Sequence, residues 1–282
     1  MTRPNIAPPV PYFGGKQRIA SQLVALFPEH EHYVEPFAGS LSVLLAKPPA
    51  KLETVNDLDG DLMTFWRILR DRPDDLARAC ALTPHSRAEH GASRDREDVP
   101  DLERARRVWV ALTQGRAGQL RRTGWRHHVT PTGTSIGMPA YLGGYVERMP
   151  AAARRLASVS LECLPALDVI AKYGADPRAL LYVDPPYLGT TRGTTSGYQH
   201  ELKAEHEHRD LAAALLESRA AVVVSGYASP LYDELFDGWH TASINAYSGQ
   251  GNASGAQGER TEVIWSNRPL ILTPTLDLEA IA

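Results

Sequence analysis

Cysteine and lysine are scarce in this sequence, and it has no long apolar run. The two cysteines among 282 residues, Cys80 and Cys163, have no zinc-binding spacing, and such low use suits a reducing cytosol. Because no stretch of 18 apolar residues occurs and the N-terminus lacks an apolar signal segment, we expect neither a membrane span nor export. A formal net charge of −3 excludes a uniformly basic surface that coats nucleic acid, so any such contact must come from a local patch.

Segments with the patterns of strands and helices alternate in both halves of the sequence. Helical spacing predicts helices at 40–47, where a serine is available as a cap, and at 61–73 and 207–219. Apolar and β-branched runs predict strands at 32–37, 52–57, 159–164, 179–184, 220–227 and 261–267. We expect the last of these to be the last strand of the sheet in chain order, with either a parallel or an antiparallel direction open. The alternation predicts an α/β fold whose open, mostly parallel sheet has about seven strands, with helices on both faces.

Residues 74–155 break this alternation, because they contain helical and turn-rich segments but no good candidate for a buried strand. We therefore expect a helical insertion here, with residues 1–73 and 156–282 forming the α/β domain. Two segments rich in glycine, serine and threonine, residues 189–197 and 248–258, are predicted to be mobile surface loops.

The sequence DPPY begins where the strand predicted at 179–184 ends. Ligands of open parallel sheets bind beyond the carboxyl ends of the strands, and Asp184 stands at that point. Pro185 and Pro186 do not continue a sheet, which leaves the Asp184 carboxylate and the Pro185 carbonyl as acceptors beside the Tyr187 ring. Two acceptors and a flat ring suit a planar ligand with an exocyclic amine, since stacking a base on an aromatic ring is worth about 1–3 kcal/mol. A strand-terminating turn is the alternative explanation.

With these residues the chain resembles the Dam-like DNA adenine-N6 methyltransferases, in which DPPY follows a buried strand. An initial Asp favours adenine N6 over protein glutamine, whose enzymes begin the motif with Asn, and over cytosine N4, whose enzymes usually begin it with Ser. Adenine stacked in a duplex cannot reach the methyl donor, so the base is expected to flip out. The resemblance implies a Rossmann-like methyltransferase fold, S-adenosylmethionine as methyl donor, double-stranded DNA as substrate, and a catalytic set of Asp184, Pro185, Pro186 and Tyr187.

The segment PYFGGK at residues 11–16 resembles the N-terminal aromatic-x-Gly-Gly-Lys motif of this family. The residues that match it, and that the resemblance assigns to the cofactor site, are Tyr12, Gly14, Gly15 and Lys16. Paired glycines let the backbone approach a ligand closely, and Lys16 is placed to meet a carboxylate or to anchor the active-site loop. A Gly-Gly turn before a helix is the alternative explanation.

The segment VEPFAGSLS resembles the family's cofactor-binding motif, Glu-Pro-Phe-x-Gly-x-Gly-Ser. The residues that it assigns to the cofactor are Glu35, Phe37, Gly39, Ser40 and Ser42. Glu35 is expected to meet the methionine ammonium directly or through water, and the backbone from Gly39 onward to lie against the methionine. The sequence departs from the motif at Leu41, where the family has its second glycine, and this disfavours close approach of a ligand there.

Acidic residues complete the expected cofactor site. Asp57 ends the second predicted strand, about 20 residues beyond that turn, where an acid accepts both ribose hydroxyls in nucleotide-binding folds. Asp59 is the alternative, and Asp61 is expected to open the next helix. Asp168 and Asp184 are also assigned to the cofactor site; for Asp168, which matches a family acid near the cofactor adenine, a helix N-cap is an equally good explanation.

A run of arginines lies within the predicted insertion. Seven arginines, but no lysine and no acid, occur from Arg104 to His128. Arginine binds phosphate and guanine through paired hydrogen bonds, so we expect this run to contact DNA. A solvated helix face is the alternative, which the absence of acids disfavours. The DNA-binding candidates are Arg116, Arg121, Arg122, Trp125 and Arg126.

The remaining expectations concern metals, partners and location. The histidines at 200–208 open a polar helix and lack metal-site companions, so we expect no metal. We expect a cytoplasmic monomer of a bacterial or phage-infected cell, and leave open whether a cognate restriction endonuclease accompanies it. The alternatives to DNA adenine methylation are transfer to another nucleobase amine, at cytosine N4 or in RNA adenine, and a non-catalytic DNA-binding relative.

Overall fold

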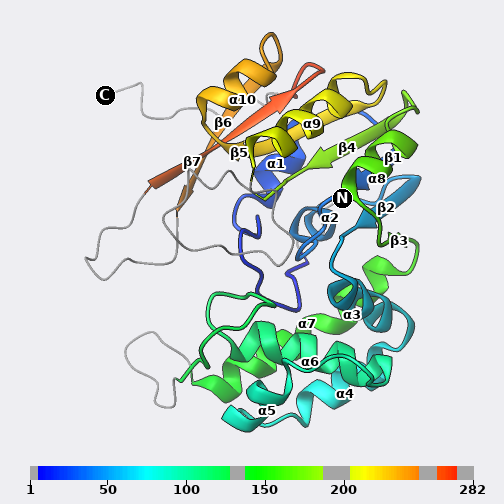
Figure 1. Ribbon diagram of the computed structural model, residues 1–282. Coiled ribbons are helices and arrows are strands. Elements are labelled where there is room, and N and C mark those ends of the chain that lie inside the picture. The colour runs from blue at the N-terminus through cyan, green and yellow to red at the C-terminus, as the bar shows by residue number, and fades with distance from the viewer. Residues whose placement is uncertain (1–5, 128–136, 187–203, 248–258, 272–282) are drawn as a thin grey trace, which may run out of the picture.

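The computed structural model describes residues 6–127, 137–186, 204–247 and 259–271 (Figure 1). A seven-stranded sheet forms its centre, in the spatial order β3-β2-β1-β4-β5-β7-β6. β1 to β5 pair in parallel, whereas β7 runs antiparallel to both of its neighbours, which confirms the mostly parallel sheet. The strands are β1 (His32–Glu35), β2 (Leu52–Asn56), β3 (Ser160–Glu162), β4 (Ala179–Val183), β5 (Ala221–Tyr227), β6 (His240–Tyr247) and β7 (Glu259–Ser266).

Helices cover both faces of the sheet, as the alternating sequence predicts. On one face Tyr33 and Leu180 pack in one core with α1 (Ala20–Leu26), α2 (Ser42–Ala46) and α3 (Gly60–Asp71). On the other face their chain neighbours Val34 and Leu181 pack with α8 (Ala166–Tyr173), α9 (Glu205–Leu216) and α10 (Pro230–Leu235). Successive strand residues thus point to opposite faces, and both faces are apolar because both are covered.

Four further helices group below the sheet in Figure 1: α4 (Pro73–Ala81), α5 (Arg87–Ala92), α6 (Asp101–Gln114) and α7 (Met138–Leu156). α3 contacts both α6 and α7, and the buried Trp109 and Met149 belong to the same core as the sheet residues above. The helical segment is therefore joined to the sheet by continuous packing, and its limits as a separate domain stay a prediction. No helix of the described ranges is long and apolar enough to cross a membrane.

Two elements escaped prediction, and one predicted cap is wrong. β6 is an edge strand, and Ile244 is the one buried side chain among its residues 240–245, so its sequence shows little apolar alternation. The six-residue α10 is too short to show a helical pattern of apolar residues. Ser40 does not cap the predicted helix at 40–47. α2 begins at Ser42, with Leu41 at the N-cap in the left-handed region (φ +55°) and no side-chain cap. The Ser40 hydroxyl instead bonds the Ser42 hydroxyl at 2.7 Å.

Candidate active site

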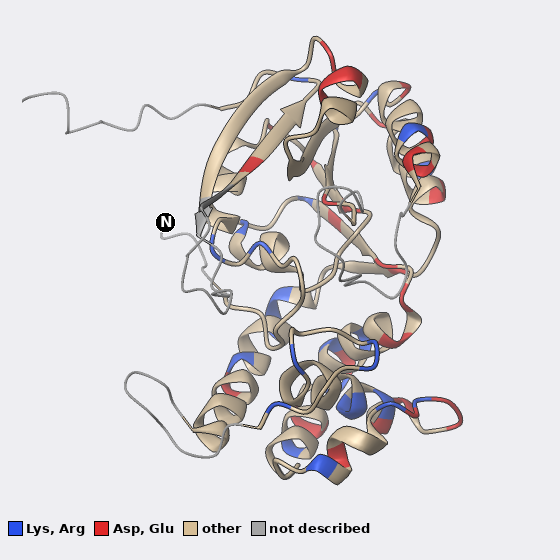
Figure 2. Ribbon diagram, turned by 60° about the vertical axis from the view of Figure 1, so that its left-hand side comes forward, with Lys and Arg blue, Asp and Glu red and all other residues tan. Residues whose placement is uncertain are grey.

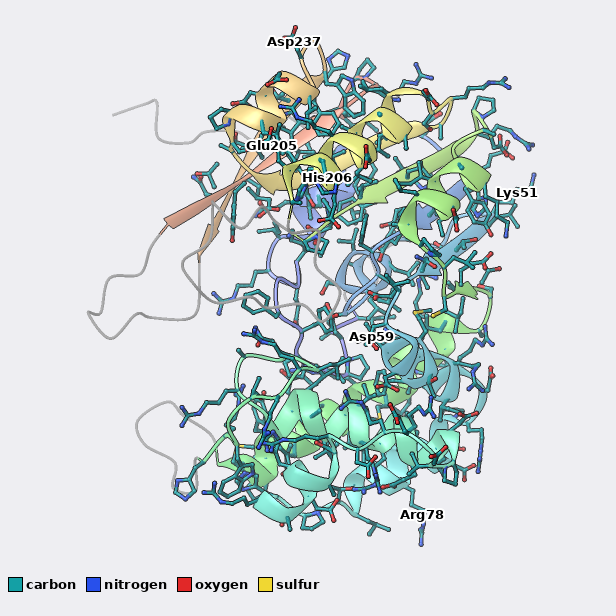
Figure 3. The ribbon with its side chains drawn as sticks, viewed as in Figure 1. Lys51, Asp59, Arg78, Glu205, His206 and Asp237 are labelled. Carbon is teal, nitrogen blue, oxygen red and sulfur yellow. The ribbon has the colours of Figure 1, made fainter. Side chains whose placement is uncertain are left out.

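A cavity of about 440 Å³ opens at the carboxyl ends of β1, β2 and β4. β1 and β4 are adjacent at the point where the strand order reverses, which is where open α/β sheets bind ligands. The volume suits a small organic ligand. Figure 3 marks the level of the cavity by Asp59, which lies between the sheet and the helices below. The predicted site residues that line it are Tyr12, Gly14, Gly15, Lys16, Glu35, Phe37, Gly39, Ser40, Ser42, Asp57, Asp184 and Pro186.

Three predicted site residues are not placed in this cavity. Asp168 lies in the first turn of α8, beyond the lining residues 165–167, and it is not the N-cap either, since that position is Pro165. Pro185 is buried between two lining residues without lining the cavity itself. Tyr187 and both low-complexity segments lie outside the described residues.

Glu35 ends β1 as a carboxyl that is 2% exposed. Burial raises the pKa of Glu35 to about 8, although hydrogen bonds from Tyr33 and from the backbone of Leu44 act in the opposite direction. The Tyr33 hydroxyl donates to Glu35 Oε1 at 2.6 Å. A buried carboxyl of this kind favours a cationic ligand, because a nearby positive charge stabilises its ionised form. Glu35 therefore fits an ammonium group better than an anion.

Asp57 links the end of β2 to the glycine-containing turn after β1. Gly39 N donates to Asp57 Oδ2 at 3.0 Å, and the Gly39 carbonyl accepts from Trp66 Nε1 at 3.0 Å. Gly39 has φ +49°, and a Cβ there would lie 3.1 Å from the Tyr12 ring, so both conformation and space require glycine. Asp57 Oδ1 also accepts from Asp59 N at 3.0 Å. A carboxylate has four acceptor positions, so the bonds from Gly39 N and Asp59 N do not exclude the predicted role of Asp57 toward ribose hydroxyls.

The other two acids of this segment have structural partners. Asp59 caps α3, because its Oδ1 accepts from Asp61 N at 3.0 Å and from Leu62 N at 3.1 Å. Asp61, which was expected to open this helix, lies in its first turn and pairs with Arg96 at 2.6 Å. Asp61 thus lies in the opening turn of this helix, as expected, and the N-cap is Asp59. Asp59 keeps a place in the cavity wall beside Asp57.

The loop before α1 brings Lys16 to the end of β4. Gly14 has φ +76°, and a Cβ on Gly15 would lie 2.9 Å from Ser40 Oγ, so this loop packs closely on the turn after β1. Lys16 Nζ lies 2.8 Å from Asp184 Oδ1 and is 7% exposed as a residue. Lys16 thus meets a carboxylate, which was one of its two predicted roles.

Leu41 points away from the cavity. Its side chain is fully buried in the core and does not belong to the cavity lining. The Leu41 side chain therefore does not occupy the cavity, and its backbone has the left-handed conformation that glycine adopts most easily. The effect of Leu41 on the approach of a ligand stays a prediction.

Several cavity residues were missed by sequence reasoning. Leu58 and Leu167 are 47% and 43% exposed while they line the cavity, and together with Phe37 they offer apolar walls for a flat ring. Asn56, which is fully buried, donates to the carbonyls of Pro36 and Leu164 at 2.9 and 3.0 Å and so ties together the loops after β1 and β3. The position of Leu58 next to Asp57 is a signal that the sequence offers for this residue, whereas nothing in the sequence distinguishes Leu167 or Asn56.

The arginine run divides into two groups. The three arginines of α6 are ion-paired, which the alternative of a solvated helix face describes well. Arg106 lies 2.7 Å from both Glu89 and Glu103, and Arg107 lies 2.7 Å from Glu103. Arg104 lies 3.9 Å from Asp61. The lack of acids inside the run was thus misleading, because the counter-charges come from just before it and from other helices.

The second group lies in residues 115–127, which we call the arginine hairpin. Arg116 N donates to Gly124 O, and Arg126 N donates to Gln114 O, so the two sides of the hairpin pair. Its four arginines, Arg116, Arg121, Arg122 and Arg126, form no ion pair with any carboxylate in the described part of the chain. Figure 2 shows that basic residues, in blue, gather in this lower half of the molecule among acidic ones.

Trp125 and the backbone anchor the arginine hairpin. The Trp125 ring stacks on His85 at 4.5 Å between centroids, and the Arg87 guanidinium lies 4.7 Å from the Trp125 ring centroid. Phe13 N donates to Gly118 O at 2.9 Å, which joins the hairpin to the loop that carries Lys16. Trp125 is therefore a packing residue of the hairpin, and the predicted DNA-binding surface adjoins the cavity through this loop.

Comparison with known proteins relates these features to a family. The chain matches the description "D12 class N6 adenine-specific DNA methyltransferase" over residues 12–97 and 146–249. The Type II methyltransferase M1.LlaDCHI of Lactococcus lactis subsp. cremoris is 27% identical over 279 residues, which cover 93% of this chain and 96% of that protein. Every residue that lines the cavity lies within the matched ranges, whereas residues 98–145, with the arginine hairpin, lie between them.

Two solved structures share only a distant likeness. Precorrin 8w decarboxylase from Methanobacterium thermoautotrophicum is 10% identical, with a TM-score of 0.38 over 94% of this chain and 97% of that chain. A SAM-dependent methyltransferase from Agrobacterium tumefaciens is 12% identical, with a TM-score of 0.36 over 89% of this chain and 61% of that chain.

Proposed function

Because the chain belongs to the family of D12 class N6 adenine-specific DNA methyltransferases, we propose that the cavity binds S-adenosylmethionine and presents Asp184 to the target adenine. Methylation of adenine in DNA follows from membership of this family. The proposal concerns which residues of the cavity bind the donor and the target base. The observation that carries it is that one cavity unites Glu35 and Asp184, at the ends of the two strands adjacent at the reversal of strand order, with Asp57 after the neighbouring β2.

The chemistry of the lining fits the methyl donor. S-adenosylmethionine supplies, when bound, a methyl group activated by a positively charged sulfur. Glu35 would pair with its ammonium group, and Asp57 would accept its ribose hydroxyls. Leu58 and Leu167 would pack against its adenine ring. The charges of the cavity are thus matched to a cationic ligand.

The end of β4 would hold the acceptor amine. The Asp184 carboxylate and the Pro185 carbonyl would accept the two N6 hydrogens, which orients the nitrogen toward the methyl group. Stacking of the flipped base on Tyr187 remains a prediction, because this residue lies outside the described ranges. The chain's contribution is orientation and electrostatics, since the leaving group is already present on the donor.

The arginine hairpin would contact double-stranded DNA. Its four arginines have no carboxylate partner among the described residues, so their charge is available to phosphates. A surface that reads a particular target must differ between enzymes with different targets, and the hairpin lies in the part of the chain that the family description leaves out. We further propose that the protein methylates a specific DNA sequence and acts as a monomer. A cognate restriction endonuclease is a candidate partner.

Methyl transfer to unmethylated duplex DNA tests this proposal. Tritium-labelled S-adenosylmethionine would be incubated with wild type, Asp184→Ala and Asp237→Ala, and the digested DNA analysed by base. Asp237 is an exposed acid at the far end of the molecule from the cavity in Figure 3 and serves as the matched control. We expect N6-methyladenine from wild type and the control, and a loss of about 10²-fold or more from Asp184→Ala.

Two results would contradict the proposal. Full activity of Asp184→Ala would remove the acceptor assignment. Label in cytosine, or in RNA alone, would reassign the substrate while leaving the cavity as the donor site.

A further inference from the structure

The Asp184 carboxylate belongs to a buried cluster of three charges. Lys16 Nζ lies 2.8 Å from Asp184 Oδ1 and 3.2 Å from Glu262 Oε1. The side chains of Lys16 and Glu262 are 6% and 4% exposed, and that of Asp184 is 16% exposed toward the cavity it lines. Glu262 comes from β7, opposite Tyr227 of β5, and lies outside the ranges that the family description matches. With all three groups ionised, the cluster carries one net negative charge.

The donors around Asp184 converge on one of its two oxygens. Ser225 Oγ donates to Asp184 Oδ1 at 3.2 Å, and Lys16 pairs with the same Oδ1. Ser225 also lies 2.9 Å from the Tyr182 hydroxyl, which fixes its position. Oδ2 accepts no hydrogen bond from the residues that the structure describes. Oδ2 is therefore the oxygen of this carboxylate that is left for the adenine amine.

We propose that Glu262 is a positioning residue for methyl transfer: it holds the Lys16 ammonium against Asp184 Oδ1 and shares its charge, so that Asp184 Oδ2 can take a proton from N6. This inference rests on the proposed function of the cavity. Glu262 itself does not contact the reacting atoms, and it acts through Lys16.

This arrangement serves the transfer of a methyl group from the donor to N6. The N6 lone pair forms the bond to the methyl carbon, and the carbon–sulfur bond breaks with its electron pair going to sulfur. One N6 proton then leaves for Asp184 Oδ2, and the product amine is neutral. An ammonium paired with Asp184 alone would lower the pKa of the Asp184 carboxyl and make the carboxylate a weak base. A second carboxylate that shares the ammonium restores the basicity of Asp184.

The charged surroundings of Asp184 agree with this role. Burial raises the pKa of Asp184, Lys16 lowers it, and Glu262 raises it again, with a net increase. The titratable groups that face Asp184 or line the same cavity from the packed elements are Tyr12, Lys16, Glu35, Asp57, Asp59, Tyr182, Glu207, Asp210, Tyr232 and Glu262.

The test is the pH profile of single-turnover methyl transfer to duplex DNA. Glu262→Gln removes a carboxylate that shares the Lys16 ammonium, so the ammonium acts more strongly on Asp184. We expect the acidic limb of the profile to move down by about one pH unit and the plateau rate to fall about tenfold. Thr261→Val, an exposed neighbour on the same strand, is the matched control and should keep the wild-type profile.

The outcomes separate this inference from the proposed function. If Asp184→Ala keeps the wild-type rate, the acceptor assignment itself fails, whereas full activity of Asp184→Asn alone would refute proton transfer to Asp184, because the Asn oxygen still accepts a hydrogen bond. If Asp184→Asn is inactive while Glu262→Gln keeps the wild-type limb, only the role of Glu262 is overturned. Should Glu262→Gln not fold, Glu262→Asp replaces it, since it keeps the negative charge on a shorter side chain. For this variant, an acidic limb at the wild-type pH with a lower plateau rate supports the inference. A wild-type plateau rate overturns it.

Discussion

Arg155, in the last turn of α7, and Glu53 of β2 form a buried ion pair that joins the helical segment to the sheet. Arg155 Nη2 lies 2.7 Å from Glu53 Oε1, and their side chains are 4% and 2% exposed. Lys47 Nζ, at the end of α2, lies 3.2 Å from the same carboxylate. Three elements thus meet at one buried acid.

Removal of the Arg155 charge is predicted to destabilise the fold strongly. Arg155→Met leaves the buried carboxylate of Glu53 with one cationic partner, and breaking such a buried pair costs about 3–5 kcal/mol. Lys51→Met, which breaks an exposed pair with Glu31, is the control and should cost less than about 1 kcal/mol. The free energies of unfolding would be measured in urea, and equal costs for the two variants would contradict the prediction.

Ionisation of Glu35 is predicted to make stability depend on pH. The pKa of Glu35 is raised to about 8 in the folded chain, from an ordinary value of 4.5, mainly by burial. The folded chain therefore keeps a proton that the unfolded chain releases, so stability falls as pH rises from about 4.5 to about 8. The glutamine of Glu35→Gln cannot ionise. The free energy of unfolding of this variant should therefore rise relative to that of wild type by about 1 kcal/mol or more between about pH 5.5 and 7.5.

Thermal unfolding at several pH values measures this difference. Glu31→Gln, at an exposed carboxyl, should leave the pH dependence of wild type unchanged. S-adenosylmethionine should raise the melting temperature of wild type but not of Glu35→Gln, because the amide cannot pair with the ammonium. A constant difference between Glu35→Gln and wild type across this range would refute the pH argument.

At position 41, the alanine variant is predicted to be less stable than the glycine variant, which is the reverse of their usual order in a helix. Its left-handed backbone (φ +55°) costs a residue with a Cβ about 1–2 kcal/mol, whereas glycine adopts it freely. Both Leu41→Ala and Leu41→Gly lose the buried side chain, at about 2–5 kcal/mol. Leu41→Ala should therefore be less stable than Leu41→Gly, by roughly 0.5–1 kcal/mol.

Ala46, the last residue of α2, supplies the opposite case for comparison, because it is buried in a helix and is not among the residues with positive φ. Ala46→Gly should lower stability by roughly 0.5–1 kcal/mol, as glycine does in a helix. Denaturant unfolding of all three variants tests the pair of predictions, and alanine more stable than glycine at both positions would show that position 41 is not strained.

The two groups of arginines are predicted to differ in DNA binding. Arg122→Ala, in the arginine hairpin, should weaken binding and reduce the slope of log affinity against log salt by about 1, since one phosphate contact is lost. Arg107→Ala, at an ion-paired position on α6, should leave the slope unchanged. Fluorescence anisotropy with labelled duplex at several salt concentrations measures both, and equal slopes for the two variants would place the DNA elsewhere.

Local signals in the sequence were sufficient for the fold class and for most of the cavity. Strands that end in an acid or a proline, such as those before Asp57 and Pro185, are recognisable from a few consecutive residues. Parallel strands place such ends at one edge of the sheet, so Glu35 and Asp184 could be predicted to lie near each other. β6 could not be predicted, because an edge strand that buries little has little apolar periodicity.

The sequence by itself determined the strand ends and the residues that stand there, because those signals are local. Only the tertiary structure decided which groups act together. It paired Lys16 with both Asp184 and Glu262, and it turned the Leu41 side chain into the core. It also supplied counter-charges to the arginines of α6 and left those of the arginine hairpin without carboxylate partners among the described residues. Lys16, Asp184 and Glu262 lie far apart in the chain, and no local pattern encodes a distance between distant residues.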